Sequence, residues 1–197
     1  MLAHPKGNLL LIEDDARFQE NLSVVFRVAG YETLFATTAE EGFSALETYQ
    51  VDLIILDYML PVMDGMQFFQ RLVHDRRYME LVGLPVVIMT GYPLAAKEYE
   101  QFKELGAKAI MTKGTGFKDL VHIIDQEVEA YKTVRNFEQE ANRNFSLPEY
   151  LAYVEKQIIL RALIKHPESS QEVIARQLGI PRSTLSRKMS DYQLRIR

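Results

Sequence analysis

The sequence contains no cysteine among its 197 residues, which excludes disulfide bonds and thiolate metal sites. Its four histidines, His4, His74, His122 and His166, are scattered without the spacing of metal ligands, and we interpret them as surface or partly packed residues. No stretch approaches the ~18 consecutive apolar residues of a membrane-spanning helix. The apolar run at residues 9–12 is too short for a secretory signal. We therefore expect a cytoplasmic protein with no membrane segment.

The composition is that of a folded protein, with 47% hydrophobic and 25% charged residues. The net charge of −4 is unevenly distributed. From residue 149 onward, nine basic and five acidic residues give +4, which leaves −8 for the rest of the chain. An acidic body joined to a basic carboxyl-terminal part suggests two domains with different partners.

Strand-like and helix-like segments alternate through the first 130 or so residues. Strands are predicted at residues 9–12, 31–35, 51–56, 84–89 and 108–111, and helices at residues 16–29, 38–49, 66–78, 95–105 and 117–131. Asp15 is expected to cap the first helix and Gly30 to end it. Alternation with short connections predicts an α/β fold, a five-stranded, doubly wound parallel sheet of flavodoxin-like type.

The domain boundaries are predicted from a change in composition. Residues 1–131 form the α/β domain, residues 132–147 a polar, amide-rich linker, and residues 148–197 a small all-α domain. Val128, Tyr131, Val134 and Phe137 could extend the last helix as a dimer-forming stalk. A solvated, partly helical connector is equally compatible with this stretch.

Five chemically capable residues follow the predicted strands. Glu13 and Asp14 come after the first strand, Asp57 after the third, Thr90 after the fourth and Lys113 after the fifth. The carboxyl ends of parallel strands meet in one crevice. Clustered carboxylates favour Mg²⁺, and a lysine can pair with phosphate oxygens, so Asp57 could act as a nucleophile and form an aspartyl phosphate. The alternative, helix caps and a solvated lysine, explains each residue singly but not their agreement at the strand ends.

The stretches LLLIEDD, LIILDYMLPVMDG, VVIMTGYP and LGAKAIMTKG resemble the receiver domain of two-component response regulators, over about residues 7–131. The resemblance implies that Asp57 accepts a phosphoryl group from a sensor histidine kinase. It implies a Mg²⁺ site formed by Glu13, Asp14, Asp57 and the main-chain carbonyl of Met59. Thr90 would turn toward the phosphoryl group, and Lys113 would pair with it.

Two positions depart from the family pattern. Gly114 follows Lys113 where the family usually has a proline, often after a cis bond. A cis bond without proline costs about 3 kcal/mol, so this loop is expected to be trans or mobile. Ile110 stands where the family usually has a tyrosine or phenylalanine coupled to the threonine. The chemistry is expected to be intact, while the way in which the domain signals is open.

The carboxyl-terminal sequence predicts three helices. They cover residues 147–165, residues 170–178 with Val173, Ile174 and Leu178 facing inward, and a third helix that starts near Pro181. Two short helices around a glycine-containing turn are typical of a helix-turn-helix, whose second helix reads the major groove. Leu185 and Met189 are expected in the core. The candidate DNA contacts are Arg182, Ser183, Thr184, Ser186, Arg187 and Lys188. A small helical bundle with a solvated basic face is the alternative.

The stretch IARQLGIPRSTLSRKM resembles the Fis-type helix-turn-helix at the end of NtrC-like regulators, over about residues 149–194. The resemblance implies a homodimer that binds double-stranded DNA at an inverted repeat. Pro181 and the HPESSQE loop depart from the family pattern, and they leave the base contacts open.

The sequence thus predicts a phosphorylation-controlled transcriptional regulator. It is not expected to be an enzyme beyond slow autodephosphorylation, because no G-x-x-x-x-G-K-[ST] loop and no room for an ATPase domain are found. The alternative is a protein-interaction module whose carboxyl-terminal helices bind a protein partner.

Overall fold

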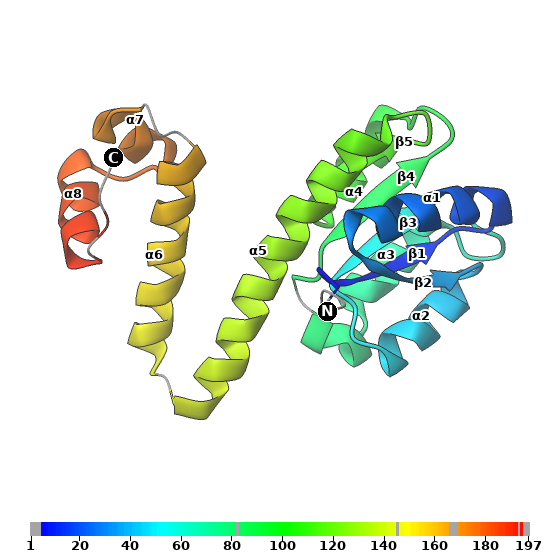
Figure 1. Ribbon diagram of the computed structural model, residues 1–197, viewed down its shortest axis with the longest axis horizontal. Coiled ribbons are helices and arrows are strands. Elements are labelled where there is room, and N and C mark those ends of the chain that lie inside the picture. Colours follow the sequence, from blue (N-terminus) through cyan, green and yellow to red (C-terminus); the bar gives the residue numbers. More distant parts are fainter. Residues whose placement is uncertain (1–4, 82, 145, 166–168, 193, 195–197) are drawn as a thin grey trace. The chain divides into compact units, whose positions relative to one another are not determined.

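The computed structural model describes residues 5–81, 83–144, 146–165, 169–192 and 194. The chain divides into two compact units, Met1–Arg135 and Asn136–Arg197. The first is an α/β unit and the second is helical (Figure 1). Among the described residues, no helix has both the length and the apolar character required to cross a bilayer.

The amino-terminal unit contains one parallel sheet in the order β2-β1-β3-β4-β5. Its strands are β1 (Asn8–Ile12), β2 (Glu32–Ala36), β3 (Leu53–Asp57), β4 (Val86–Thr90) and β5 (Ala109–Thr112). All four pairings are parallel; Ile12 pairs with Leu56, and Asp57 with Met89. Every residue of β3 and β4 is buried, as expected for central strands covered on both faces. The predicted five-stranded, doubly wound sheet is confirmed.

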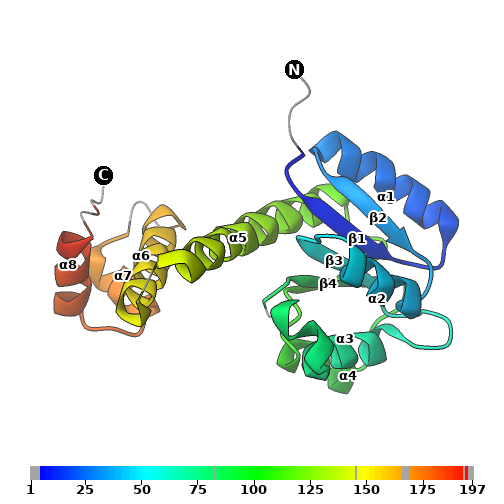
Figure 2. The same ribbon diagram turned by 90° about the horizontal axis from the view of Figure 1, so that it is seen from below.

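Helices cover both faces of the sheet (Figure 2). They are α1 (Ala16–Ala29), α2 (Ala39–Thr48), α3 (Gly65–His74), the 3₁₀ helix η1 (Arg76–Leu81), α4 (Ala96–Glu104) and α5 (Phe117–Asn144). Alternate residues of β1 separate the two cores. Leu9 and Leu11 pack with α1 and α5, whereas Leu10 and Ile12 pack with α2, α3 and α4. This alternation follows from the two-residue period of a strand.

The ends of α1 follow the sequence. The Asp15 carboxylate accepts hydrogen bonds from the backbone N–H groups of Arg17 and Phe18, at 2.9 and 3.2 Å. Gly30 ends the helix in the left-handed region, with φ 92°. Both predicted caps are confirmed.

Two helices differ in length from their predictions. The third helix was expected at residues 66–78, but α3 ends at His74 because Asp75 is extended and its carboxylate accepts from Arg77 N at 3.0 Å. Helix α5 was expected to end near residue 131, but it continues to Asn144. The additional residues include Lys132, Arg135, Glu138, Gln139 and Glu140, which are good helix formers, and contain no glycine or proline. The first part of the predicted linker is therefore helical.

The carboxyl-terminal unit contains α6 (Leu147–Lys165), α7 (Gln171–Gln177) and α8 (Arg182–Asp191). Its described core consists of Ile159, Leu163, Ile174, Ala175, Leu185 and Met189. The inward position predicted for Val173 is wrong. Its side chain is 43% exposed, and the neighbouring Ala175 is buried instead. The short helix α7 is therefore rotated so that Ala175, rather than Val173, faces the core. Residues 166–168 of the predicted HPESSQE loop lie outside the described residues.

Candidate functional site at the carboxyl edge of the sheet

The five predicted residues lie at the carboxyl edge of the sheet. Glu13 and Asp14 follow β1, Asp57 ends β3, Thr90 ends β4, and Lys113 follows β5. Glu13 and Asp57 are 0% and 2% exposed, whereas Asp14 is exposed. Backbone hydrogen bonds hold these ends together, because Lys113 N donates to Thr90 O at 2.8 Å.

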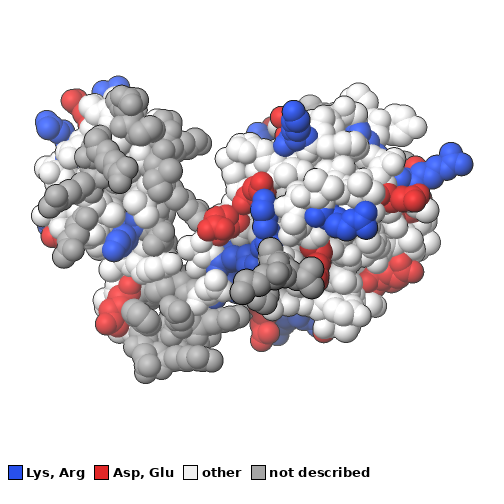
Figure 3. All heavy atoms as spheres, in the orientation of Figure 1, with Lys and Arg blue, Asp and Glu red and all other residues white. Residues whose placement is uncertain are grey.

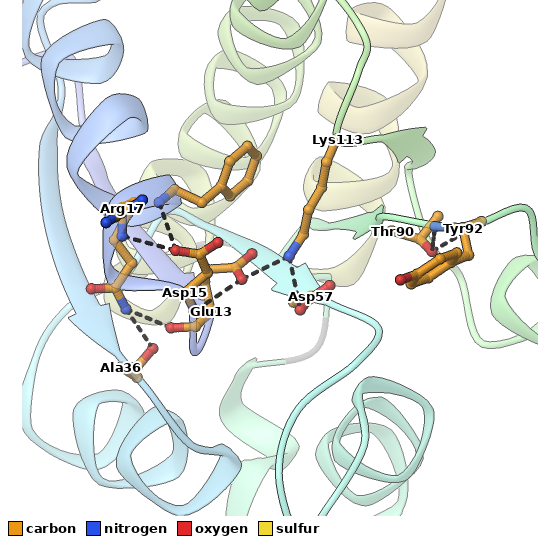
Figure 4. A network of polar contacts seen from close by, with 10 residues as sticks. Glu13, Asp15, Arg17, Ala36, Asp57, Thr90, Tyr92 and Lys113 are labelled. Atoms are coloured by element: carbon orange, nitrogen blue, oxygen red, sulfur yellow. Dashed lines mark hydrogen bonds and ion pairs between the residues drawn. The ribbon is translucent and has the colours of Figure 1, made fainter.

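Lys113 joins the two buried acids (Figure 4). Its Nζ donates to Glu13 Oε1 at 2.7 Å and to Asp57 Oδ2 at 3.0 Å. Burial raises the pKa of both carboxyl groups, and the bond from Lys113 opposes this shift. Burial also lowers the pKa of Lys113, but its two carboxylate partners outweigh this, and the net shift is upward. One ammonium group thus balances two buried acids, with a third acid beside them.

The acidic residues fit a divalent cation. Glu13, Asp14 and Asp57 each offer a carboxylate oxygen, and these oxygens lie within 4.8 Å of one another. Among the described residues, the second oxygens of the two buried acids, Glu13 Oε2 and Asp57 Oδ1, have no hydrogen-bond partner. Buried carboxylate oxygens are normally paired, so this arrangement suits a hard cation that prefers oxygen ligands.

Thr90 does not contact Asp57 in this structure. Its buried hydroxyl donates to Tyr92 O at 2.7 Å and accepts from Tyr92 N at 3.1 Å. Figure 4 shows Thr90 beside Tyr92, away from the network around Lys113. The fourth strand thus delivers its threonine to the crevice, but the hydroxyl is engaged within its own loop.

The loop after β3 packs tightly against the strand. Gly65 N donates to Tyr58 O at 2.9 Å, and a Cβ on Gly65 would lie 2.3 Å from the carbonyl oxygen of Asp57. No other residue fits there without moving the loop. Met59 lies in this loop with a 56% exposed side chain, and its nearby backbone N–H lowers the pKa of the Asp57 carboxyl group. The role of its carbonyl as a ligand stays a prediction.

Sequence reasoning missed one contact beside the site. The Tyr58 hydroxyl donates to the Glu98 carboxylate on α4, which raises the pKa of Tyr58 to about 12. Its ring meets Phe102 edge-on, with centroids 5.9 Å apart. Nothing in the sequence relates Tyr58 to Glu98.

The structure also shows the two positions that depart from the receiver-domain pattern. Ile110 packs against the core formed with α2, α3 and α4, and the Lys113–Gly114 peptide bond is trans.

The model of the response regulator receiver domain matches residues 9–125, more than half of the chain. The chain belongs to this family. A second model, described as a helix-turn-helix domain, matches residues 144–195. The amino-terminal unit is therefore a receiver, and the unit that follows is a helix-turn-helix domain.

The curated relatives are named as transcriptional regulatory proteins or as response regulators. The chain is 32% identical over 117 residues to the phosphate regulon transcriptional regulatory protein PhoB of Pseudomonas aeruginosa, covering 57% of this chain and 48% of PhoB. It is 28% identical over 211 residues to a Halalkalibacterium halodurans protein named "Probable C4-dicarboxylate response regulator DctR", covering 96% and 87% of the two chains. The chain spans about half the length, or less, of the first curated relatives that it matches.

Solved structures agree with the receiver fold. A CheY-like response regulator receiver domain protein from Methanospirillum hungatei has a TM-score of 0.57 and 24% identity, covering 64% of this chain and 97% of its own. A receiver domain protein from Clostridium thermocellum has a TM-score of 0.56 and 24% identity, covering 65% and 98%. At this identity the likeness shows the fold.

Helix α8 carries the predicted DNA contacts. Arg182, Ser183, Ser186 and Arg187 are exposed, and Thr184 is half-buried. Lys188 is partly covered: its Nζ lies 2.5 Å from Glu155 Oε2, an oxygen that also accepts from the Tyr192 hydroxyl at 2.6 Å. The lysine thus ties α8 to α6. On the receiver face drawn in Figure 3, basic and acidic side chains are interspersed.

Proposed function

We propose that the protein is a response regulator whose receiver is phosphorylated on Asp57 by a sensor histidine kinase, and whose helix-turn-helix domain binds DNA to control transcription. The observation that carries the receiver part is the contact of Lys113 with Glu13 and Asp57 at 2.7 and 3.0 Å. A DNA ligand and a kinase donor imply a cytoplasmic protein.

The proposed reaction uses Asp57 as the nucleophile. A carboxylate oxygen attacks the phosphorus of a phosphohistidine, the P–N bond breaks, and the leaving imidazole nitrogen takes up a proton. The product is an acyl phosphate on Asp57. Lys113 already lies beside this carboxylate and pairs with the added phosphoryl oxygens. Thr90 gives up its bonds to Tyr92 and turns toward the phosphoryl group.

A Mg²⁺ ion held by Glu13, Asp14, Asp57 and the main-chain carbonyl of Met59 would supply positive charge opposite the phosphoryl oxygens. The support for this ligand set is the close approach of the three carboxylates and the two unpaired buried oxygens. In this proposal the chain accepts a phosphoryl group and releases it slowly, and it does not hydrolyse ATP.

For the carboxyl-terminal unit we propose a Fis-type helix-turn-helix that reads the major groove with α8. The exposed Arg182 and Arg187 suit guanine edges and phosphates, and Ser183 and Ser186 suit phosphates or bases. The support for the Fis-type subtype is the resemblance of the stretch IARQLGIPRSTLSRKM to that family. The ion pair of Lys188 with Glu155 indicates a structural role for this lysine rather than a direct contact with DNA.

We also propose that the protein is a homodimer joined through α6. Leu147, Leu151 and Ile158 on this helix are 70%, 58% and 51% exposed, and an apolar groove of about 630 Å³ runs beside them. Exposed apolar patches of this kind mark interaction sites. A two-fold dimer reads an inverted repeat. The same surface favours the alternative function, an interaction module for a different protein, if the chain proves monomeric.

The test is DNA binding by the full chain to a fragment selected from a random pool, over a range of salt, with and without beryllofluoride and Mg²⁺. We expect affinity to fall steeply as salt rises, because contacts to phosphates release counterions. Tighter binding with beryllofluoride, which mimics the phosphoryl group, supports the switch. Equal binding with and without it removes phosphorylation control and leaves a constitutive DNA-binding protein.

The matched variants are Arg187→Ala on α8 and Arg27→Ala on α1, both exposed arginines. We expect Arg187→Ala to weaken binding by about tenfold or more, because a bidentate arginine contact contributes ~1–3 kcal/mol. Arg27→Ala should bind as the wild type does. Equal loss in both variants would indicate general attraction to charge rather than recognition by α8.

A further inference from the structure

A third buried acid lies at the opposite end of β3 from the proposed phospho-acceptor. Asp52 directly precedes the strand that Asp57 ends, and it is only 2% exposed. Two hydrogen bonds fix it to β1. Its backbone N–H donates to Asn8 O at 2.8 Å, and its Oδ2 accepts from Asn8 N at 2.9 Å. This carboxylate has no part in the chemistry at the carboxyl edge.

Helix α5 supplies the counter-charges. Arg135 Nη1 lies 2.7 Å from Asp52 Oδ1 in an ion pair, although the contact lacks the angles of a well-aligned hydrogen bond. Lys132 Nζ lies 3.8 Å from Asp52 Oδ2 and donates to Lys6 O at 2.8 Å. The Arg135 side chain is itself only 17% exposed. The helix is thus tied to the amino edge of the sheet by charges that water barely reaches.

Further contacts orient the guanidinium group. With the Gln50 amide oriented so that its oxygen faces the arginine, that oxygen accepts from Nη2 at 2.9 Å and Nη1 at 3.0 Å. The guanidinium carbon also lies 5.4 Å from the centre of the Tyr131 ring. A Cβ on Gly7 would lie 2.9 Å from Asp52 Oδ2 and 3.1 Å from Val128 Cγ1. Gly7 therefore lies close against both the acid and the helix, and a larger residue there would displace one of them.

We infer that Asp52 and Arg135 are positioning residues that anchor the far end of the receiver's last helix, and that phosphorylation controls DNA binding only while this anchor holds. The inference rests on the proposed function. Helix α5 continues from Arg135 to Asn144 and is the chain's covalent path to the helix-turn-helix domain. A change at Asp57 reaches that path as a defined displacement only if the helix stays fixed to the sheet.

Burial distinguishes the Asp52–Arg135 ion pair from an ordinary ion pair at the surface. An exposed ion pair contributes little, because water screens it. Removing one partner of a buried pair leaves an uncompensated charge, which releases the helix rather than merely weakening it. Lys6 provides the matched control at the same edge. It pairs with Asp125 at 2.9 Å, but the two side chains are 53% and 40% exposed.

The experiment compares the full-length wild type with Arg135→Met, Asp52→Asn and Lys6→Met. Three quantities are measured for each: beryllofluoride binding, the ratio of DNA affinities with and without beryllofluoride, and hydrogen exchange along α5. We expect wild type and Lys6→Met to share one ratio, of about tenfold, a common size for coupling between sites. Arg135→Met and Asp52→Asn should bind beryllofluoride normally but show a ratio near one, with faster exchange confined to α5 after residue 128.

A wild-type ratio in Arg135→Met, or unchanged exchange in α5, would overturn the anchor. A ratio of one in the wild type would show instead that the proposed phosphorylation switch fails, and the coupling role fails with it. Arg135→Lys serves if Arg135→Met does not fold. It keeps the charge but loses the second guanidinium arm, so we expect an intermediate ratio. A ratio in Arg135→Lys equal to that of the wild type would also count against the anchor.

Discussion

Strand β3 carries a buried carboxylate at each of its ends, and the two differ in how they are neutralised. At the amino end, Asp52 faces the arginine and lysine of α5 and is bonded to the backbone of β1. At the carboxyl end, Asp57 shares one lysine with Glu13 and lies beside Asp14. The first site holds two cations for one acid, and the second holds one cation for three.

The difference in charge balance separates a structural acid from a reactive one. Among the described residues, Asp52 Oδ1 and Asp57 Oδ1 both lack a well-aligned hydrogen bond, but Asp52 Oδ1 lies 2.7 Å from a guanidinium nitrogen that it shares with no other acid in this cluster, whereas the lysine beside Asp57 also pairs with Glu13. Burial raises the pKa of Asp57, which marks a carboxylate whose charge is incompletely compensated. In the proposed function, the incomplete compensation at Asp57 leaves the site able to accept a cation and a phosphoryl group. At Asp52, the two cations of α5 compensate the charge and hold the helix instead.

The largest expected effect comes from replacing the acid at one end of β3 and then the acid at the other. Asp57→Asn should abolish phosphoryl uptake from acetyl phosphate, a loss of more than about 100-fold, because the nucleophile is gone. Asp52→Asn, at the other end of the same strand, should still be phosphorylated. The measurement is radiolabel incorporation. Labelling that survives Asp57→Asn would place the acceptor at another carboxylate.

Removal of the arginine tests the structural end. We expect Arg135→Met to lower the free energy of unfolding by about 3 kcal/mol, because it leaves the Asp52 charge buried with only the more distant lysine. Urea unfolding followed by circular dichroism measures this loss. The double variant Asp52→Asn/Arg135→Met should be more stable than Arg135→Met alone, since no buried charge remains. Additive losses in the double variant would mean that the two side chains do not interact.

Magnesium should discriminate between the two ends. At a concentration 100-fold above its dissociation constant, a bound cation stabilises the folded state by about 2.7 kcal/mol. We expect this gain, measured as a shift in the unfolding curve, in the wild type and in Asp52→Asn. Asp57→Asn lacks a ligand and should show a much smaller shift. Equal shifts in all three proteins would place the cation elsewhere.

The smallest expected effect is a gain in stability from Asp57→Asn without Mg²⁺. A carboxyl group whose pKa is raised on folding stabilises the protein at pH values below its unfolded pKa and loses that contribution as the pH rises through the folded pKa. Ionised Asp57 is therefore unfavourable at neutral pH. We expect Asp57→Asn to be more stable than wild type by about 1 kcal/mol at pH 7, on the scale of an unpaired buried polar group.

The pH dependence provides the control for this variant. The advantage of Asp57→Asn should shrink as the pH falls through the raised folded-state pKa of Asp57, and it should be gone well below the ordinary aspartate value of 3.8, where the wild-type carboxyl group is protonated in both states. Urea unfolding at about pH 3 and about pH 7 measures the difference. An advantage that is the same at both pH values would assign the effect to packing rather than to charge.

The carboxyl end of β3 was predictable from sequence and the amino end was not. Each residue around Asp57 follows a strand, and parallel topology brings strand ends together, so Glu13, Asp57 and Lys113 could be placed in one crevice. Asp52 lies inside the predicted strand at residues 51–56, and nothing in the sequence marks it as a buried acid with a distant partner. Its arginine is 83 positions away in a stretch assigned to a polar linker, and only the length of α5 brings the two together.

Helix ends and short helices account for the other differences. Periodicity predicted that Val173 and Ile174 face inward; Ile174 does, but α7 has only seven residues and buries Ala175 in place of Val173. In so short a helix, the pattern of apolar residues fits two neighbouring choices of the inward face about equally well, so periodicity does not decide between them. The state of Thr90 was also beyond sequence, because its partner is the backbone of Tyr92, and backbone groups are the same at every position.

The two hydrogen bonds between the Thr90 hydroxyl and Tyr92 affect the proposed basal activity of the unphosphorylated protein. A turn of the hydroxyl toward Asp57 gives up both bonds, each contributing about 1 kcal/mol. Without a phosphoryl group to bond with, the turned rotamer is then disfavoured by about 30-fold and is populated in only a few per cent of molecules. In the proposed function, this small population limits signalling in the absence of phosphorylation, and the loop that holds Thr90 therefore sets the basal activity of the receiver.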